Sequence, residues 1–157
     1  GFNMTRREIR DNAFKLIFEQ SLRDDDIQEL YEIAEEIDEI TVDEEVRKMV
    51  EGTLSKKQEI DSIISQYSKS RSIERISKLN LAIIRIAVYE CLYDENTPVD
   101  AAISEAVKLA SVYTYQEDTS FINGLLGAFA RDRKENQNGT DAIGEGKGKR
   151  TPDKQAK

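Results

Sequence analysis

Residues 78–93 read KLNLAIIRIAVYECLY, a stretch with few charged side chains. Its only charged side chains are Lys78, Arg85 and Glu90, while apolar side chains fall on nearly every side of a helix drawn through it. A helix of this length that is apolar all round has to be buried. We therefore predict that residues 78–93 form the central helix, around which the rest of the chain packs.

Amphipathic patterns on both sides of this stretch predict further helices. Apolar spacing and capping residues indicate helices over residues 5–22, 23–40, 44–68, 98–113 and from about 118 to 135. Gly52 interrupts the third, for which a close helix crossing would be the reason. Gly124 and Gly127 would allow close packing of the last helix. No segment shows the pattern of a strand, so we predict an all-α fold.

The pattern predicts a single helical domain over residues 4–135. Residues 1–3, GFN, precede Met4 and resemble an expression scar. A polar connection near residues 68–77 divides an N-terminal helical subdomain, about 5–68, from a C-terminal one, about 72–134. Residues 136–157 are polar and rich in glycine and lysine, which is typical of a disordered tail.

Composition argues against an enzyme or a metal protein. The 157 residues include no histidine and a single cysteine, Cys91. The commonest general base and the commonest metal ligand are therefore missing, and Cys91 lies among apolar residues typical of a buried thiol. The sequence shows no phosphate-binding glycine loop and no apolar run that could cross a bilayer, and we expect no signal peptide. We expect a cytoplasmic, non-catalytic protein with no catalytic residue, metal or cofactor.

An arginine cluster opens the first predicted helix. Arg6, Arg7 and Arg10 stand there although the chain carries a net charge of -8 and positive charge at a helix start opposes the helix dipole. On a helical wheel they fall within the apolar arc. Two interpretations stay open: the arginines pair with carboxylates of a neighbouring helix, or they rim a groove that binds nucleic acid phosphate.

The second predicted helix is strongly acidic. Between Asp24 and Glu45 every ionisable side chain except Tyr31 is an acid. Such a face is usually solvated, and it is poorly suited to nucleic acid. It also supports an alternative function, in which the chain is a non-catalytic helical protein-interaction module that recruits a basic partner.

Four segments taken together resemble the NusB family of bacterial transcription antitermination factors. They are RREIRDNAFKLIFEQ, LAIIRIAVYECLY, TPVDAAISEAVKLASVY and EDTSFINGLLGAFAR, which span about residues 5–133 in this order. The resemblance implies a seven-helix fold of two three-helix bundles without catalytic activity. It also implies that boxA RNA of ribosomal RNA transcripts and ribosomal protein NusE bind together, and that the protein joins an RNA polymerase antitermination complex.

The same resemblance implies where the partners bind. The positions that match RNA-contacting residues of the family are Arg6, Arg7, Arg10, Tyr113, Glu117, Asp118, Ser120 and Phe121. Tyr113 would stack on a base, and Glu117 or Asp118 would accept a hydrogen bond from a base amino group. Phe18 and Asn80 match positions that contact NusE, although Asn80 stands where an acidic residue is common.

Three alternatives remain open at this stage. The loop TYQEDTS can be aligned in two registers, so Glu117 and Asp118 compete for one role. A homodimer could cover the same basic groove. A similar helical RNA-binding domain also precedes the catalytic part of some ribosomal RNA methyltransferases.

Overall fold

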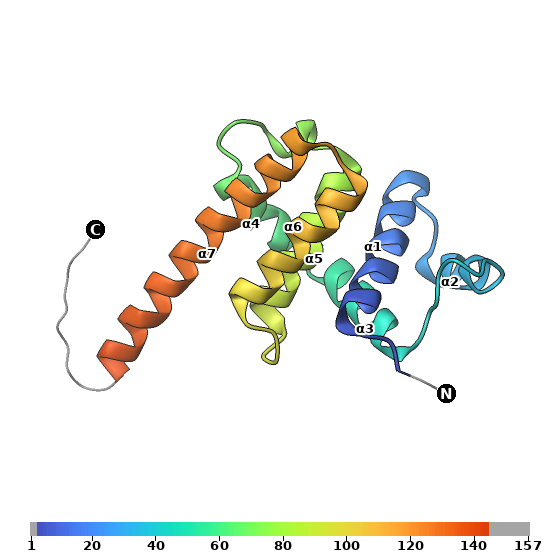
Figure 1. The fold of residues 1–157 in the computed structure, drawn as a ribbon, viewed down its shortest axis with the longest axis horizontal. Coiled ribbons are helices and arrows are strands. Elements are labelled where there is room, and N and C mark those ends of the chain that lie inside the picture. Colours follow the sequence, from blue (N-terminus) through green and yellow to red (C-terminus); the bar gives the residue numbers. More distant parts are fainter. Residues whose placement is uncertain (1–2, 145–157) are drawn as a thin grey trace.

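The computed structural model describes residues 3–144, and the side chains of residues 3–133. Within this range the chain forms seven α-helices, one 3-10 turn and no strand, which confirms the all-α prediction (Figure 1). The elements are α1 (Arg6–Arg23), α2 (Ile27–Glu35), α3 (Glu44–Ser55), α4 (Lys57–Tyr67), the 3-10 turn Ile73–Arg75, α5 (Lys78–Tyr93), α6 (Val99–Tyr113) and α7 (Gln116–Gly144).

Helix α5 occupies the centre of the fold, as predicted from its apolar sequence. Almost every side chain from Asn80 to Cys91 is buried, and the helix contacts α1 and α3 on one side and α4, α6 and α7 on the other. Ser77 begins the helix by accepting a hydrogen bond from the backbone N–H of Asn80 at 3.1 Å. Burial of this apolar surface against both groups of helices is the main force that holds them together.

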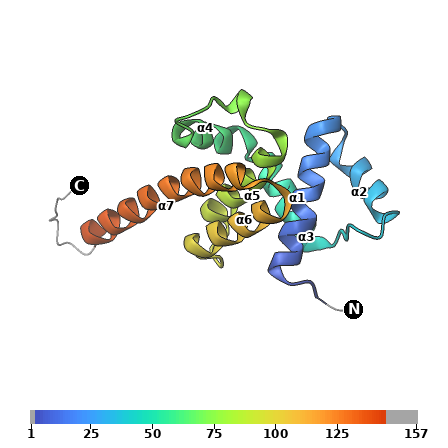
Figure 2. The same ribbon diagram turned by 45° about the horizontal axis from the view of Figure 1, so that its top comes forward.

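The helices form two groups, and the boundary between them differs from the predicted one. Helices α1, α2 and α3 pack together, whereas α4 packs against α5 and α7, so the N-terminal group ends before α4 (Figures 1 and 2). The predicted helix over residues 44–68 is in fact two helices. They separate at Lys56, whose φ of -106° and ψ of 14° leave helical geometry. Packing on different partners explains the break.

The glycines of the sequence have unequal roles. A Cβ atom added to Gly52 would overlap the ring and hydroxyl of Tyr89, so the predicted close crossing between α3 and α5 is confirmed. At Gly124 an added Cβ would meet nothing within 4 Å, and at Gly127 only an Arg131 nitrogen at 3.8 Å. The prediction that these two glycines allow close packing is therefore wrong.

Helix α7 continues beyond the predicted end of the domain. The structure follows it to Gly144, whereas the sequence predicts a disordered tail from residue 136. No proline occurs between Pro98 and Pro152, and extending an existing helix is easier than starting one, because each added residue gains a hydrogen bond. Residues 1–2 and 145–157, which include most of the predicted scar and the rest of the tail, lie outside the described residues.

Substitution of the two helical glycines tests their different surroundings. We expect Gly52→Ala to lower the free energy of unfolding by about 1–3 kcal/mol, the usual cost of overpacking, because the new methyl group displaces Tyr89. The matched variant Gly124→Ala should instead raise it by up to about 1 kcal/mol, since alanine favours the helix. Urea unfolding measures both, and equal effects would contradict this reading of Gly52.

Candidate functional site

The arginine cluster begins at a well-formed helix start. The Thr5 hydroxyl accepts a hydrogen bond from the backbone N–H of Glu8 at 3.1 Å, and the Glu8 carboxylate accepts one from the backbone N–H of Thr5 at 2.7 Å. This capping box starts α1 at Arg6 and offsets the unfavourable charge of the arginines that follow. The arginine side chains point from α1 toward α5 and α6.

Two of the arginines meet a buried carboxylate of α5. Arg10 Nε donates to Glu90 Oε1 at 2.7 Å, and Arg6 Nη2 donates to Glu90 Oε2 at 3.0 Å. Arg6 also donates to Asp94 at 2.6 Å. The Glu90 side chain is fully buried and that of Arg10 is only 9% exposed. Arg10 and Glu90 are therefore part of the interior, whereas Arg6 stands at its edge.

Arg7 pairs with α6. Its Nε and Nη2 atoms donate to Glu105 Oε1 and Oε2 at 2.9 and 3.0 Å, so the two side chains are joined by a two-bond fork. The hydrogen bond from Arg7 lowers the pKa of Glu105 from 4.5 to about 2. The Arg7 side chain is nevertheless 67% exposed. Pairing with carboxylates of neighbouring helices is thus confirmed for all three arginines, and Arg7 keeps most of its surface in solvent.

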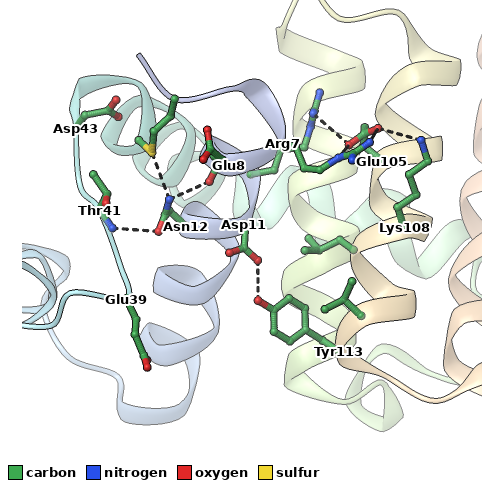
Figure 3. A pocket seen from close by; sticks show the side chains of 14 residues that line it. Arg7, Glu8, Asp11, Asn12, Glu39, Thr41, Asp43, Glu105, Lys108 and Tyr113 are labelled. Atoms are coloured by element: carbon green, nitrogen blue, oxygen red, sulfur yellow. Dashed lines mark hydrogen bonds and ion pairs between the residues drawn. The ribbon is translucent and has the colours of Figure 1, made fainter. Parts of the chain in front are cut away.

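A groove of about 730 Å³ lies beside these pairs, between α1, α6 and the loop over residues 39–43 (Figure 3). Met4, Leu109 and Val112 are among the apolar residues that line it. Asn12 fixes the loop to α1, because its side chain accepts a hydrogen bond from the backbone N–H of Thr41 and donates one to the carbonyl of Glu8. The groove is therefore formed in advance of any ligand.

Tyr113 closes the groove at the end of α6. Its hydroxyl donates to Asp11 at 2.7 Å, and its ring lies 5.0 Å from that of Phe14. Burial, followed by the bond to Asp11, raises the pKa of Tyr113, so the phenol stays protonated. The structure thus brings Arg7, Arg10 and Tyr113 together around one groove, although the Tyr113 ring is already partly packed.

The predicted residues of α7 lie apart from this groove. Glu117 and Ser120 are exposed. Asp118 lies 3.9 Å from the Arg71 guanidinium, which stacks 4.0 Å above the centre of the Phe121 ring. The proposed site therefore has two parts, a groove between α1 and α6 and a surface at the start of α7, joined by the short connection from Tyr113 to Gln116.

Tyr115 lies in the segment between α6 and α7 and is a candidate that the sequence analysis did not identify. It is 85% exposed, more than any other large apolar or aromatic side chain among the described residues, and Val112 before it is 73% exposed. The buried positions of α6 end at Ala110, so the aromatic residues of the YTY segment lie beyond the core positions of this helix. This mismatch between the end of the apolar pattern and the sequence YTY could have identified Tyr115.

The two residues predicted to contact NusE have different surroundings. Phe18 is half-buried and stacks on Phe14 with ring centres 6.1 Å apart, so it keeps an accessible side. Asn80 is 1% exposed, and its side-chain amide has no hydrogen-bond partner among the described residues. Because the first turn of α5 directs this side chain inward, Asn80 has no surface to offer a partner in this structure.

Other chemistry finds little support in the described part of the chain. Burial raises the pKa of the Cys91 thiol to about 12, so it stays protonated and unreactive at neutral pH. Among residues whose placement is described, no group of three or more acidic or cysteine side chains could hold a metal ion. No described helix is both long and apolar enough to traverse a membrane.

Comparison with known proteins identifies one family. A family model described as the NusB family matches residues 7–131. Transcription antitermination protein NusB of Acetivibrio thermocellus is 38% identical over 128 residues, which cover 79% of this chain and 87% of that protein. The structure of T. maritima NusB is 30% identical with a TM-score of 0.72, over 83% of this chain and 93% of that one. A chain in the crystal structure of antitermination factors NusB and NusE in complex with dsRNA is 25% identical to this one, with a TM-score of 0.71. The match covers 81% of this chain and 96% of that chain.

The buried pair of Arg10 and Glu90 gives a stability prediction. Glu90→Ala leaves Arg10 buried without its carboxylate, and we expect the free energy of unfolding to fall by about 3–5 kcal/mol. The double variant Arg10→Met with Glu90→Leu removes both charges and should recover most of this loss. Urea unfolding measures both variants. A double variant as unstable as Glu90→Ala would show that the charge left behind is not the cause.

Proposed function

We propose that this chain, which belongs to the NusB family, binds boxA RNA of ribosomal RNA transcripts together with ribosomal protein NusE. The complex would act in the cytoplasm, where it keeps RNA polymerase processive. Membership of this non-catalytic family of transcription antitermination factors confirms that the chain is not an enzyme. The relatives named above are antitermination proteins, which favours this role over that of a methyltransferase domain. The observation that carries the proposal is the exposed guanidinium of Arg7 at the rim of a preformed groove.

The phosphate contacts fall to the exposed arginines. Arg7, at 67% side-chain exposure, and Arg6, at 43%, can reach a ligand in solvent, whereas Arg10 is enclosed with Glu90. Arginine suits phosphate because its planar fork donates two parallel hydrogen bonds. Within the predicted RNA site, Arg7 and Arg6 therefore bind the backbone, and Arg10 positions α1.

The groove itself repels a polyanion. Acidic side chains outnumber basic ones along its walls: Glu8, Asp11, Glu39, Asp43 and Glu105 stand against Arg7, Arg10 and Lys108. At physiological salt such charges act over about 8 Å. The RNA backbone therefore follows the edge formed by Arg7 and Lys108 on α1 and α6, and avoids the wall formed by the loop over residues 39–43.

Base contacts fall to the connection between α6 and α7. Single-stranded bases need aromatic faces, and the exposed Tyr115 ring offers more free surface than the Tyr113 ring, which packs on Phe14. Exposed Glu117 can accept a hydrogen bond from a base amino group, while Asp118 lies beside Arg71. This favours Glu117 over Asp118 for the base-edge contact and adds Tyr115 as the stacking residue.

The alternative function uses the acidic helix α2. Ile33 of this helix and Ile37 in the turn that follows it are 37% and 42% exposed among acidic neighbours, a surface that suits a basic partner protein. Fluorescence anisotropy with labelled boxA RNA, with and without NusE, separates the two functions. Binding no better than to a scrambled strand, even with NusE present, would favour the interaction module.

A homodimer that covers the groove would compete with RNA and would appear as weaker binding at high protein concentration.

Replacement of Arg7 tests the phosphate contact. We expect Arg7→Ala to weaken boxA binding about three- to tenfold across RNA sequences and to reduce the slope of log K against log salt by about 0.7, the value for one phosphate on a single strand. Arg23→Ala at the other end of α1 is the matched control, because Arg23 is 49% exposed and also pairs with a carboxylate. Equal effects of the two variants would refute a specific role for Arg7.

Replacement of Tyr115 tests base stacking. Tyr115→Ala should weaken RNA binding by about 1–3 kcal/mol, the usual value for one stacked base, with little change in the salt dependence. Tyr115→Phe keeps the aromatic face and should bind like the unaltered protein. Because the side chain is 85% exposed, neither change should affect folding, which thermal unfolding can verify. Equal binding by the alanine and phenylalanine variants would exclude stacking at this position.

A further inference from the structure

Three cationic side chains gather around one carboxylate at the rim of the groove. Glu105 receives the two-bond fork of Arg7, and one of its oxygens lies 3.4 Å from Lys108 Nζ (Figure 3). The other lies 3.9 Å from Arg10 Nη1. The charges come from α1 and α6, which are far apart in the sequence. A carboxylate in such surroundings occupies the same kind of place as a bound phosphate, because arginine contacts both anions with the same planar geometry.

We propose that Glu105 occupies the phosphate subsite of the free protein, and that incoming RNA phosphate displaces it from Arg7 and Lys108. This inference rests on the proposed RNA-binding function and deepens it. It gives Lys108, beside Arg7, a direct contact with the phosphate and makes Glu105 a competitor that lowers the affinity for RNA. The ligand chemistry is a phosphodiester of single-stranded RNA.

The exposure of the three cations shows which of them can exchange partners. Arg7 and Lys108 have side chains that are 67% and 59% exposed, so both can turn from Glu105 toward solvent. Arg10, at 9%, is held by its 2.7 Å bond to Glu90 and stays. After the exchange Glu105 keeps Arg10 nearby, so its carboxylate is not left without a compensating charge.

Protonation does not open this pair under ordinary conditions. Arg7 holds the pKa of Glu105 at about 2, so the carboxylate is ionised throughout the pH range in which RNA is handled. A competing anion is therefore the means of separating Arg7 from Glu105. If Glu105 only held Arg7 in position for the RNA, its removal would have the opposite effect. Arg7 would become less ordered, and the affinity for RNA would fall.

The experiment compares Glu105→Gln with the unaltered protein in boxA RNA titrations at several salt concentrations, with NusE present. We expect about two- to fivefold tighter binding, the range for release of an exposed ion pair, and a salt slope steeper by up to about 0.7. Glu35→Gln is the matched control. It makes the same change of charge and also breaks a surface pair with an arginine, Arg47, but on α2 and α3.

Each outcome distinguishes displacement of Glu105 by phosphate from a purely structural role of Glu105. Unchanged or weaker binding by Glu105→Gln, or an equal gain from Glu35→Gln, overturns the displacement of Glu105 while the proposed function stands. Unaltered protein that fails to prefer boxA RNA refutes the proposed function itself. In the Arg7→Ala background the gain from Glu105→Gln should shrink, and an undiminished gain would show that general charge, and not competition for Arg7, is responsible. Thermal unfolding confirms that each variant is folded.

Discussion

A fully buried carboxylate, that of Glu90, joins the two groups of helices by accepting hydrogen bonds from Arg6 and Arg10. Taking such a charge out of water is costly unless its partners are correctly placed. The start of α1 therefore has to lie against α5 in one register. Because the capping box begins α1 at Arg6, the same constraint sets where Arg7 emerges and where the groove beside α6 opens.

Because of this constraint, the three arginines of the cluster have different roles. Arg10 is buried, and Arg6 is partly exposed but pairs with Glu90 and Asp94. Most of the arginine surface that a ligand can reach therefore belongs to Arg7. The unfavourable charge at the helix start is thus largely offset by carboxylates of other helices. A single pattern of three arginines serves both folding and the proposed binding, and the sequence alone could not separate the two roles.

Patterns that arise from burial were predicted well. The central position of α5 followed from its apolar sequence, and the close crossing at Gly52 followed from a glycine inside a helix. The break at Lys56 could not be foreseen, because the buried positions Thr53, Ile60 and Ile64 keep one helical phase across it. There the choice of packing partner, not the local sequence, decides where the helix ends.

Surface features were harder to predict because exposed positions follow no periodic rule. Gly124, like Gly52, is a glycine inside a helix, but it faces open space. Asn80, which the family resemblance assigned to a partner contact, is buried. The partner of Arg7 could not be predicted either, because Glu105 is far from Arg7 along the chain and only the fold brings the two together. Tyr115 had one signal in the sequence, its place beyond the last buried position of α6, and its 85% exposure made that signal clear.

The net charge of -8 places a limit on how such a protein can bind RNA. Non-specific affinity for nucleic acid comes mainly from neutralised phosphates, and here few exposed cations line the groove among more numerous acids. In the proposed complex, weak general attraction leaves discrimination to base stacking and hydrogen bonds at the connection between α6 and α7 and the first turn of α7, and to the proposed second protein. Acidity then works in favour of selectivity, because RNA without the right bases gains too little from the phosphate contacts alone.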